Sequence, residues 1–329
     1  MNRSAKRTAA ALACIAIALA PLAMKPYGIY IMSLWAVMTV AAIGLNLTLG
    51  YAGQVSLAQA AFVGIGTYTT AILTTHGGSF WLALGLAAAI CFALGWLLGY
   101  PALRVQHHYL AFVTLSFSTL AFLVFRNEEW LTGGVYGMSN IPRPDLLGWS
   151  AKSPYGFFLV CLGTLALVTA GAWWIVRSPW GRAFTALREN PVRASSLGVD
   201  TRRYTLMAFA IGSALGGVAG ALYAPLVQFI DPSMFILSLS LNLLLMVIVG
   251  GSGYFLGPFV GALVAVLLPE WLRFSEGLYL IIYALLVMVL MIFCPSGLLG
   301  LLERGRDVVT RRSLLLLPAA PDGTPGEGA

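Results

Sequence analysis

Long apolar stretches separated by short polar ones make up most of the chain. Several approach the roughly 20 apolar residues that a helix needs to cross a bilayer. Their approximate bounds are 8–23, 29–49, 52–73, 80–100, 109–125, 155–176, 204–230, 236–249, 254–268 and 278–293. We therefore expect an all-α protein, a polytopic transmembrane helical bundle of about ten spans.

The composition supports a membrane protein. Of the 329 residues, 59% are hydrophobic and only 9% are charged, whereas an ordinary soluble domain has roughly 25% charged residues. The net charge is +7, and the basic residues lie in the gaps between apolar segments. This placement indicates membrane topology and argues against nucleic-acid binding.

The arginines predict the orientation of the chain. Six lie between residues 176 and 204, against only two acids in the same stretch, and loops rich in Lys and Arg are cytoplasmic. We therefore expect a cytoplasmic coupling loop at 178–203, and ten spans place both termini on the same cytoplasmic side. The neutral loop 126–153 is then external. Residues 1–303 form the expected membrane domain, and residues 304–329 a cytoplasmic tail rich in Pro and Gly that we expect to be disordered.

The first apolar segment has two interpretations. It is either a retained span or a cleaved signal peptide, because a basic start, a short apolar stretch and the run Ala18, Leu19, Ala20 are typical of such leaders. Cleavage leaves the remaining topology unchanged.

The sequence provides no catalytic residues, metal site or cofactor site. None of Lys6, Lys25 and Lys152 follows a glycine, so the phosphate-binding loop of ATPases is missing. The four cysteines are scattered singly, without the spacing of a metal site or a disulfide framework. A membrane enzyme built on His107 and His108 lacks an acidic or Cys partner. We expect that the chain is not an enzyme.

Intrinsic ion coupling is also disfavoured. Ion-coupled transporters usually hold an acidic residue within a membrane span. The acidic residues here lie in loops or at segment ends, and Asp231 and Glu270 are the two that come closest to a span. Any pumping must then draw energy from a partner chain. A passive channel remains the alternative from another class.

The coupling loop has the pattern of two short helices. Arg182 and Glu189 are about two turns apart beside an apolar stripe, and Pro191 opens a second helix that Gly198 ends. With its arginines pointing outward, the loop fits a groove on a soluble partner; a basic anchor on anionic lipid is the alternative. The candidate coupling residues are Arg182, Arg188, Glu189, Asn190, Arg193 and Gly198.

Polar residues interrupt the third apolar segment and the end of the second segment before it. Asn46, Gln54, Ser56 and Gln59 either bond neighbouring helices or face a wet path, because an amide in hydrocarbon needs partners. An internal echo of Leu-Asn-Leu at 45–47 and 241–243 adds Asn242, since transporters often contain repeated halves. These five residues are the candidates for lining a translocation path.

Gly212, Gly216 and Gly220 recur every four residues in the seventh segment. Residues four apart share one face of a helix, so this glycine ladder lets another helix approach closely. We expect it to serve helix packing within the chain.

Three stretches carry a family resemblance. They are residues 44–66 (GLNLTLGYAGQVSLAQAAFVGIG), 131–142 (LTGGVYGMSNIP) and 178–198 (SPWGRAFTALRENPVRASSLG). In this order they resemble the permease subunits of branched-chain amino acid ABC transporters, specifically the LivM-type membrane subunit. The sequence departs from the family at residues 191–196, where a stretch usually richer in Ala and Glu is expected.

The resemblance implies a type II importer architecture in the bacterial inner membrane. Two permeases pair, this chain with a LivH-type subunit; two cytoplasmic ATPases bind ATP beneath them, and an external binding protein delivers the substrate. It implies a permease for branched-chain amino acids, with urea or short amides as alternative cargo within the family. The implied partners are these proteins and the lipid bilayer, without nucleic acid.

Overall fold

A computed structural model describes residues 25–102, 107–146, 149–150, 153–271 and 297–301, with the single positions 282, 285 and 288. Eight of the ten expected apolar segments lie on these residues, and each contains a helix. The segment 8–23 lies outside the described residues, as does most of 278–293. The expected α-helical class is confirmed, apart from one pair of two-residue strands.

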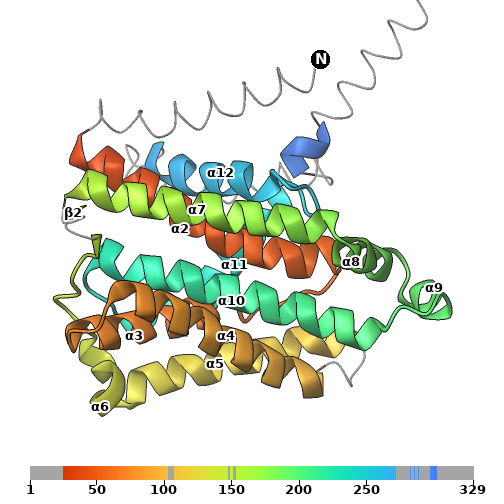
Figure 1. Ribbon diagram of the computed structural model, residues 1–329, viewed down its shortest axis with the longest axis horizontal. Helices are drawn as coiled ribbons and strands as arrows, with labels where there is room; N and C mark the ends of the chain where they lie inside the picture. The colour runs from red at the N-terminus through yellow and green to blue at the C-terminus, as the bar shows by residue number, and fades with distance from the viewer. Residues whose placement is uncertain are drawn as a thin grey trace, which may run out of the picture.

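Five of the described helices are long and apolar enough to cross a membrane, counting α2 together with the turn that extends it. They run side by side along the length of the molecule (Figure 1). Their bounds are α2 (Pro26–Leu45), α4 (Phe80–Ala102), α5 (His107–Asn127), α7 (Pro154–Arg177) and α10 (Thr201–Val227). Three shorter helices accompany them: α3 (Gln59–Thr75), α11 (Leu237–Gly250) and α12 (Gly257–Trp271).

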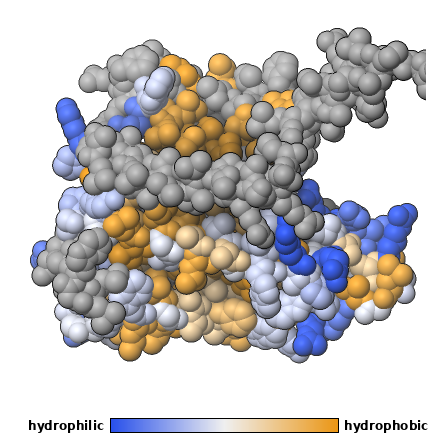
Figure 2. All heavy atoms as spheres, turned by 45° about the horizontal axis from the view of Figure 1, so that its top comes forward, coloured by the Kyte–Doolittle hydropathy of each residue, from blue (hydrophilic) through white to orange (hydrophobic). Residues whose placement is uncertain are grey.

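Small elements cover the two ends of this bundle. At one end lie α8 (Pro179–Glu189) and α9 (Pro191–Ser196), and at the other lie α6 and β2 (Figure 1). The remaining bounds are η2 (Asn46–Tyr51), α6 (Glu129–Thr132), η3 (Gly134–Tyr136), η4 (Pro232–Phe235) and the antiparallel pair β1 (Asp145–Leu146) and β2 (Trp149–Ser150). Apolar residues dominate the middle of the surface, whereas hydrophilic residues gather at the end with α8 and α9 (Figure 2). This distribution fits a bilayer around the middle.

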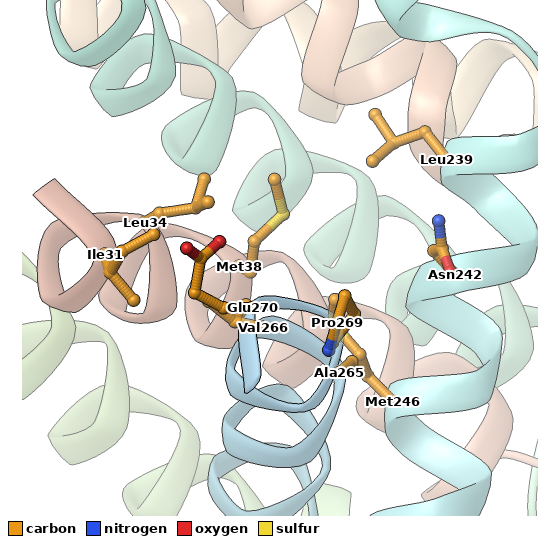
Figure 3. A pocket seen from close by; sticks show the side chains of 10 residues that line it. All are labelled: Ile31, Leu34, Met38, Leu239, Asn242, Met246, Ala265, Val266, Pro269 and Glu270. Atoms are coloured by element: carbon orange, nitrogen blue, oxygen red, sulfur yellow. The ribbon is translucent and has the colours of Figure 1, made fainter. Parts of the chain in front are cut away.

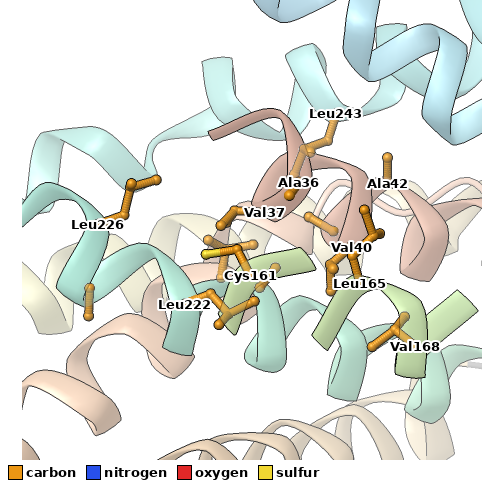
Figure 4. Close-up of a cluster of buried hydrophobic side chains, with 14 of the residues drawn as sticks. Ala36, Val37, Val40, Ala42, Cys161, Leu165, Val168, Leu222, Leu226 and Leu243 are labelled. Carbon is orange, nitrogen blue, oxygen red and sulfur yellow. The ribbon is translucent and has the colours of Figure 1, made fainter. Parts of the chain in front are cut away.

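The core lies where α2, α7, α10 and α11 meet. Val40, Leu165, Leu222 and Leu243 contribute one side chain from each helix and are at most 3% exposed (Figure 4). Several hydroxyl groups inside the helices bond back to their own helix, as Thr39 does to the Trp35 carbonyl at 2.7 Å. Because such a hydroxyl is satisfied locally, it fits an apolar interior.

The chain breaks its helical path between α2 and α3. Helix α2 continues into the π-helical turn η2, and residues 52–58 are not helical before α3 begins at Gln59. The expected span 52–73 is therefore wrong at its start. Gly53, with φ +70°, takes the left-handed conformation that ends the turn. π-Helical turns are rare and occur often at functional sites.

Candidate functional site

The coupling loop forms the two short helices that the sequence predicts. Ser178 caps α8, its hydroxyl accepting the Trp180 N–H at 3.1 Å. Asn190 caps α9 in the same way through the Arg193 N–H at 3.0 Å. A proline follows each cap, a position where its missing N–H is harmless. Both helices are thus fixed by their own local sequence.

Helix α8 rests on the bundle by its apolar face. Phe184 and Leu187 are buried, and the Phe184 ring meets the Tyr204 ring of α10 edge-on, with centroids 6.4 Å apart. Arg182 and Glu189 are exposed on the other face of α8. The expected amphipathic helix is therefore present, and its polar face is accessible.

Helix α9 stands further out and exposes apolar side chains beside a basic one. Val192 is 74% exposed, Leu197 is 83% exposed, and Arg193 is exposed between them. Gly198 follows with φ +83° and ends the helix. Exposed apolar residues rimmed by charge are typical of a protein interaction site.

Arg188 is an exposed residue of α8, but its guanidinium group reaches back to the bundle. Its Nη1 donates to the carbonyl of Gly50 at the end of η2. The same guanidinium lies against Gly253, where a methyl group would overlap it. An arginine can reach inward here because its donors find a carbonyl that the broken helix leaves without a helical partner.

Asn46 joins the same place to the turn between α11 and α12. Its Nδ2 donates to the Tyr254 carbonyl, and its Oδ1 accepts the Gly253 N–H, both at 3.0 Å. We call Asn46, Gly50, Arg188, Gly253 and Tyr254 the Arg188 junction. It brings together three segments that are distant along the chain: Arg188 lies 138 residues from Gly50, and Tyr254 lies 208 residues from Asn46.

The other polar residues expected to line a path are buried inside the bundle. Gln59 donates to the carbonyls of Ala41 and Gly212, at 3.2 and 3.3 Å. Gln54 donates to the Thr205 carbonyl at 3.2 Å, and the Ser56 hydroxyl accepts the Ala58 N–H at 3.3 Å.

Asn46, Gln54, Ser56 and Gln59 are only 2–3% exposed. Path lining by these four residues stays a prediction. Three of them, Asn46, Gln54 and Gln59, bond to backbone in other elements, which favours the alternative of hydrogen bonds between helices.

The glycine ladder faces α2 and α3. A methyl group at Gly212 would lie 2.6 Å from Thr48 Cγ2 and 2.7 Å from the Gly44 carbonyl oxygen. One at Gly216 would meet Gln59 Nε2 at 2.9 Å. At Gly220, a methyl group would overlap the α3 backbone, 2.8 Å from the Thr67 nitrogen. The ladder thus packs within the chain, backbone close to backbone.

A cavity of about 380 Å³ lies between α2, α11 and α12 (Figure 3). Asn242 of α11 and Glu270 of α12 are its polar residues. The apolar lining consists of Ile31, Leu34, Met38, Leu239, Met246, Ala265, Val266 and Pro269. Asn242 is thus the one path candidate that borders this cavity.

Glu270 lies in the last turn of α12, at the end of the ninth segment, where the sequence places it. Its carboxylate projects from α12 toward Met38 of α2 (Figure 3). One signal for it is present in the sequence, because it is the acid closest to the end of that segment. Pro269 just before it favoured a helix end, yet α12 continues through that residue.

Helix α6 and the turn η3 after it, within the expected loop 126–153, form a protrusion; α6 lies at the end opposite to α8 and α9 (Figure 1). Thr132 is buried and its hydroxyl bonds to the carbonyls of Phe125 and Glu128, at 2.7 and 2.8 Å. On this base, Trp130 is 81% exposed and Tyr136 is 84% exposed. The glycine-rich run thus shapes a fixed turn that displays aromatic residues.

Comparison with known proteins gives a family for most of the chain. The family model described as branched-chain amino acid transport system / permease component matches residues 27–294. The high-affinity branched-chain amino acid transport system permease protein LivM of Escherichia coli (strain K12) is 35% identical, over 78% of this chain and 66% of that protein. LivM of Salmonella typhimurium gives the same values. The match thus spans just under two thirds of these relatives' length.

A second group of relatives carries a different name. The autoinducer 2 import system permease protein LsrC of Klebsiella pneumoniae is 29% identical, over 51% of each chain. No solved structure matches the chain.

Proposed function

The chain belongs to the family of branched-chain amino acid transport system permease components, and on that premise we propose that it is the membrane-spanning permease subunit of an ATP-driven importer for branched-chain amino acids. The observation that carries the proposal is the capped helix pair α8–α9. It projects from one end of a helical bundle with accessible Arg182, Arg193, Val192 and Leu197. Such a surface fits a partner that supplies mechanical work.

In this proposal the chain performs no covalent chemistry and binds no cofactor. Two cytoplasmic ATPase subunits bind ATP, close on it, and push α8 and α9. Because α8 rests on the bundle through Phe184 and Leu187, its displacement is passed to the transmembrane helices. These tilt so that a central path between this chain and a second, LivH-type permease opens alternately to either face.

The exposed aromatic residues support docking of an external substrate-binding protein. Trp130 belongs to α6, which lies at the end of the molecule opposite to α8 and α9 (Figure 1), and Tyr136 ends the η3 turn that follows it. In the proposed orientation, loop 178–203 is cytoplasmic, loop 126–153 is external, and the bundle lies in the bacterial inner membrane. Trp and Tyr are typical anchors of protein interfaces.

The cavity supports an aliphatic cargo that carries an amine. Leu34, Met38, Met246 and Val266 offer apolar contacts, and the Glu270 carboxylate offers a partner for an ammonium group. Urea, short amides and the cargo named for the LsrC relatives are the alternatives. Urea and short amides lack both the aliphatic side chain and the cation.

Reconstitution tests the proposal. The chain is purified with its neighbouring permease, ATPases and binding protein, and radiolabelled leucine uptake into liposomes is measured. We expect uptake only with ATP and the binding protein, with competition by isoleucine and valine and not by urea, acetamide or autoinducer 2. The chain alone is expected neither to hydrolyse ATP nor to concentrate leucine.

The runner-up, a passive channel, makes the opposite prediction. Leucine flux that needs no ATP, and that persists when Arg188 and Glu189 are both changed to Ala, would favour a channel. Competition by autoinducer 2 alone would reassign the cargo while keeping the importer class.

A further inference from the structure

We propose that Arg188 is a positioning residue that joins α8 to all three helices around the cavity, so that α8 cannot move without moving them. The role in transport rests on the proposed function, whereas the mechanical link is a property of the fold. The inference comes from the Arg188 junction, where the coupling helix, the end of α2 and the α11–α12 turn meet.

The first contact is to the end of the α2–η2 unit. The last carbonyls of a helix have no partner within it, and the negative end of the helix dipole favours a cation there. Gly50 lies in this last turn, and its carbonyl accepts Arg188 Nη1. Arg188 thus acts as a cap from another segment, 138 residues away.

The second contact is to the turn between α11 and α12. Gly253 has φ +84°, and a methyl group there would overlap the Arg188 guanidinium. The N–H of Gly253 is bound by Asn46, so the turn and the end of α2 already form one unit. The guanidinium lies against both parts of that unit.

The joined segments are those that bound the cavity. Its lining residues come from α2, α11 and α12, and the junction holds the end of α2 together with the turn that connects α11 to α12. A displacement of α8 by the 1–2 Å typical of helix shifts would therefore strain all three helices at once. Arg182 and Arg193 are also exposed, and among the described residues neither makes a contact that joins α8 or α9 to these helices.

Hydrogen–deuterium exchange of the full chain in lipid nanodiscs tests the mechanical link. Arg188→Met keeps the apolar stem and removes the donors. We expect about tenfold faster exchange in both segments 46–56 and 250–256, the scale of losing one charge-assisted hydrogen bond. Arg203→Met is the matched control. Arg203 is exposed, and its side chain makes no hydrogen bond or ion pair with another described residue. Unchanged exchange, or a change in only one segment, would overturn the link.

Transport tests the coupling role in the complete importer. We expect Arg188→Met and Gly253→Ala to retain ATP hydrolysis while leucine uptake per ATP falls about tenfold, with partial rescue by Arg188→Lys, which keeps one cationic donor. Gly85→Ala on α4, where an added methyl group meets no described atom within 4 Å, should match the wild type. A normal ratio of uptake to hydrolysis in Arg188→Met, despite faster exchange, would overturn the coupling role. If the wild type moves no leucine, the proposed function fails, and the exchange experiment still decides the link.

Discussion

Close contact between α10 and α3 makes Gly220→Ala a quantitative test of the packing. The added methyl group would overlap the Val63 carbonyl oxygen and lie 2.8 Å from the Thr67 nitrogen. Both are backbone atoms, so no flexible side chain can make room. The two helices must separate, and the bond from Thr67 Oγ1 to the Gly220 carbonyl, 3.0 Å long, is weakened with them.

The expected loss of stability is the sum of three effects. Overpacking a well-packed site typically costs about 1–3 kcal/mol, and an interhelical hydrogen bond in a membrane protein contributes about 0.6 kcal/mol. Replacing Gly by Ala in a helix returns up to about 1 kcal/mol. We therefore expect Gly220→Ala to lower the free energy of unfolding by about 1–3 kcal/mol.

Reversible unfolding in mixed micelles, followed by circular dichroism, measures the difference. Gly163→Ala and Gly171→Ala on α7 are matched controls, because a methyl group at either position meets no described atom within 4 Å. These two should be as stable as the wild type or slightly more stable. The reasoning is refuted if Gly220→Ala unfolds together with the two controls.

Three further predictions concern the junction, the cavity and the protrusion that carries Trp130 and Tyr136. Asn46→Leu leaves the Gly253 N–H and the Tyr254 carbonyl without their Asn46 partner. It should therefore lower the free energy of unfolding by about 1–3 kcal/mol in the same assay, and an unchanged unfolding midpoint would contradict the assigned hydrogen bonds. Glu270→Gln should raise the KM of leucine uptake about tenfold, because the charged contact to the cargo is lost; an unchanged KM would remove Glu270 from the proposed cargo site. The double variant Trp130→Ala, Tyr136→Ala should bind the substrate-binding protein at least about tenfold more weakly in biolayer interferometry, while its free energy of unfolding stays within about 0.5 kcal/mol of the wild type. Equal affinity would exclude this surface as the docking site of the binding protein.

Local patterns were enough to predict much of the fold. Each apolar segment on described residues contains a helix, because hydrophobicity and length decide membrane insertion with little tertiary information. The ends of α8 and α9 also followed from the sequence, since the caps Ser178 and Asn190, and Gly198 after α9, act within a few residues of themselves. Such signals need no knowledge of distant parts of the chain.

The misassigned features depend on distant contacts. Arg188 lies on the polar side of an amphipathic helix, and nothing nearby reveals a free carbonyl 138 residues away. Ser240 went unnoticed for the same reason: its hydroxyl donates to the Leu57 carbonyl at 2.8 Å and accepts the Ala60 N–H at 3.0 Å. It thereby satisfies backbone groups at the start of α3, which permits the break before Gln59.

The glycine positions on α10 also restrict how the bundle can deform. Gly217 would overlap α4 if it carried a methyl group, which would lie 2.7 Å from the Ala87 carbonyl oxygen, while Gly212, Gly216 and Gly220 face α2 and α3. Where main chains are in direct contact, as at Gly217 and Gly220, no rotamer change can make room during sliding. We therefore expect α3, α4 and α10 to move together as one unit.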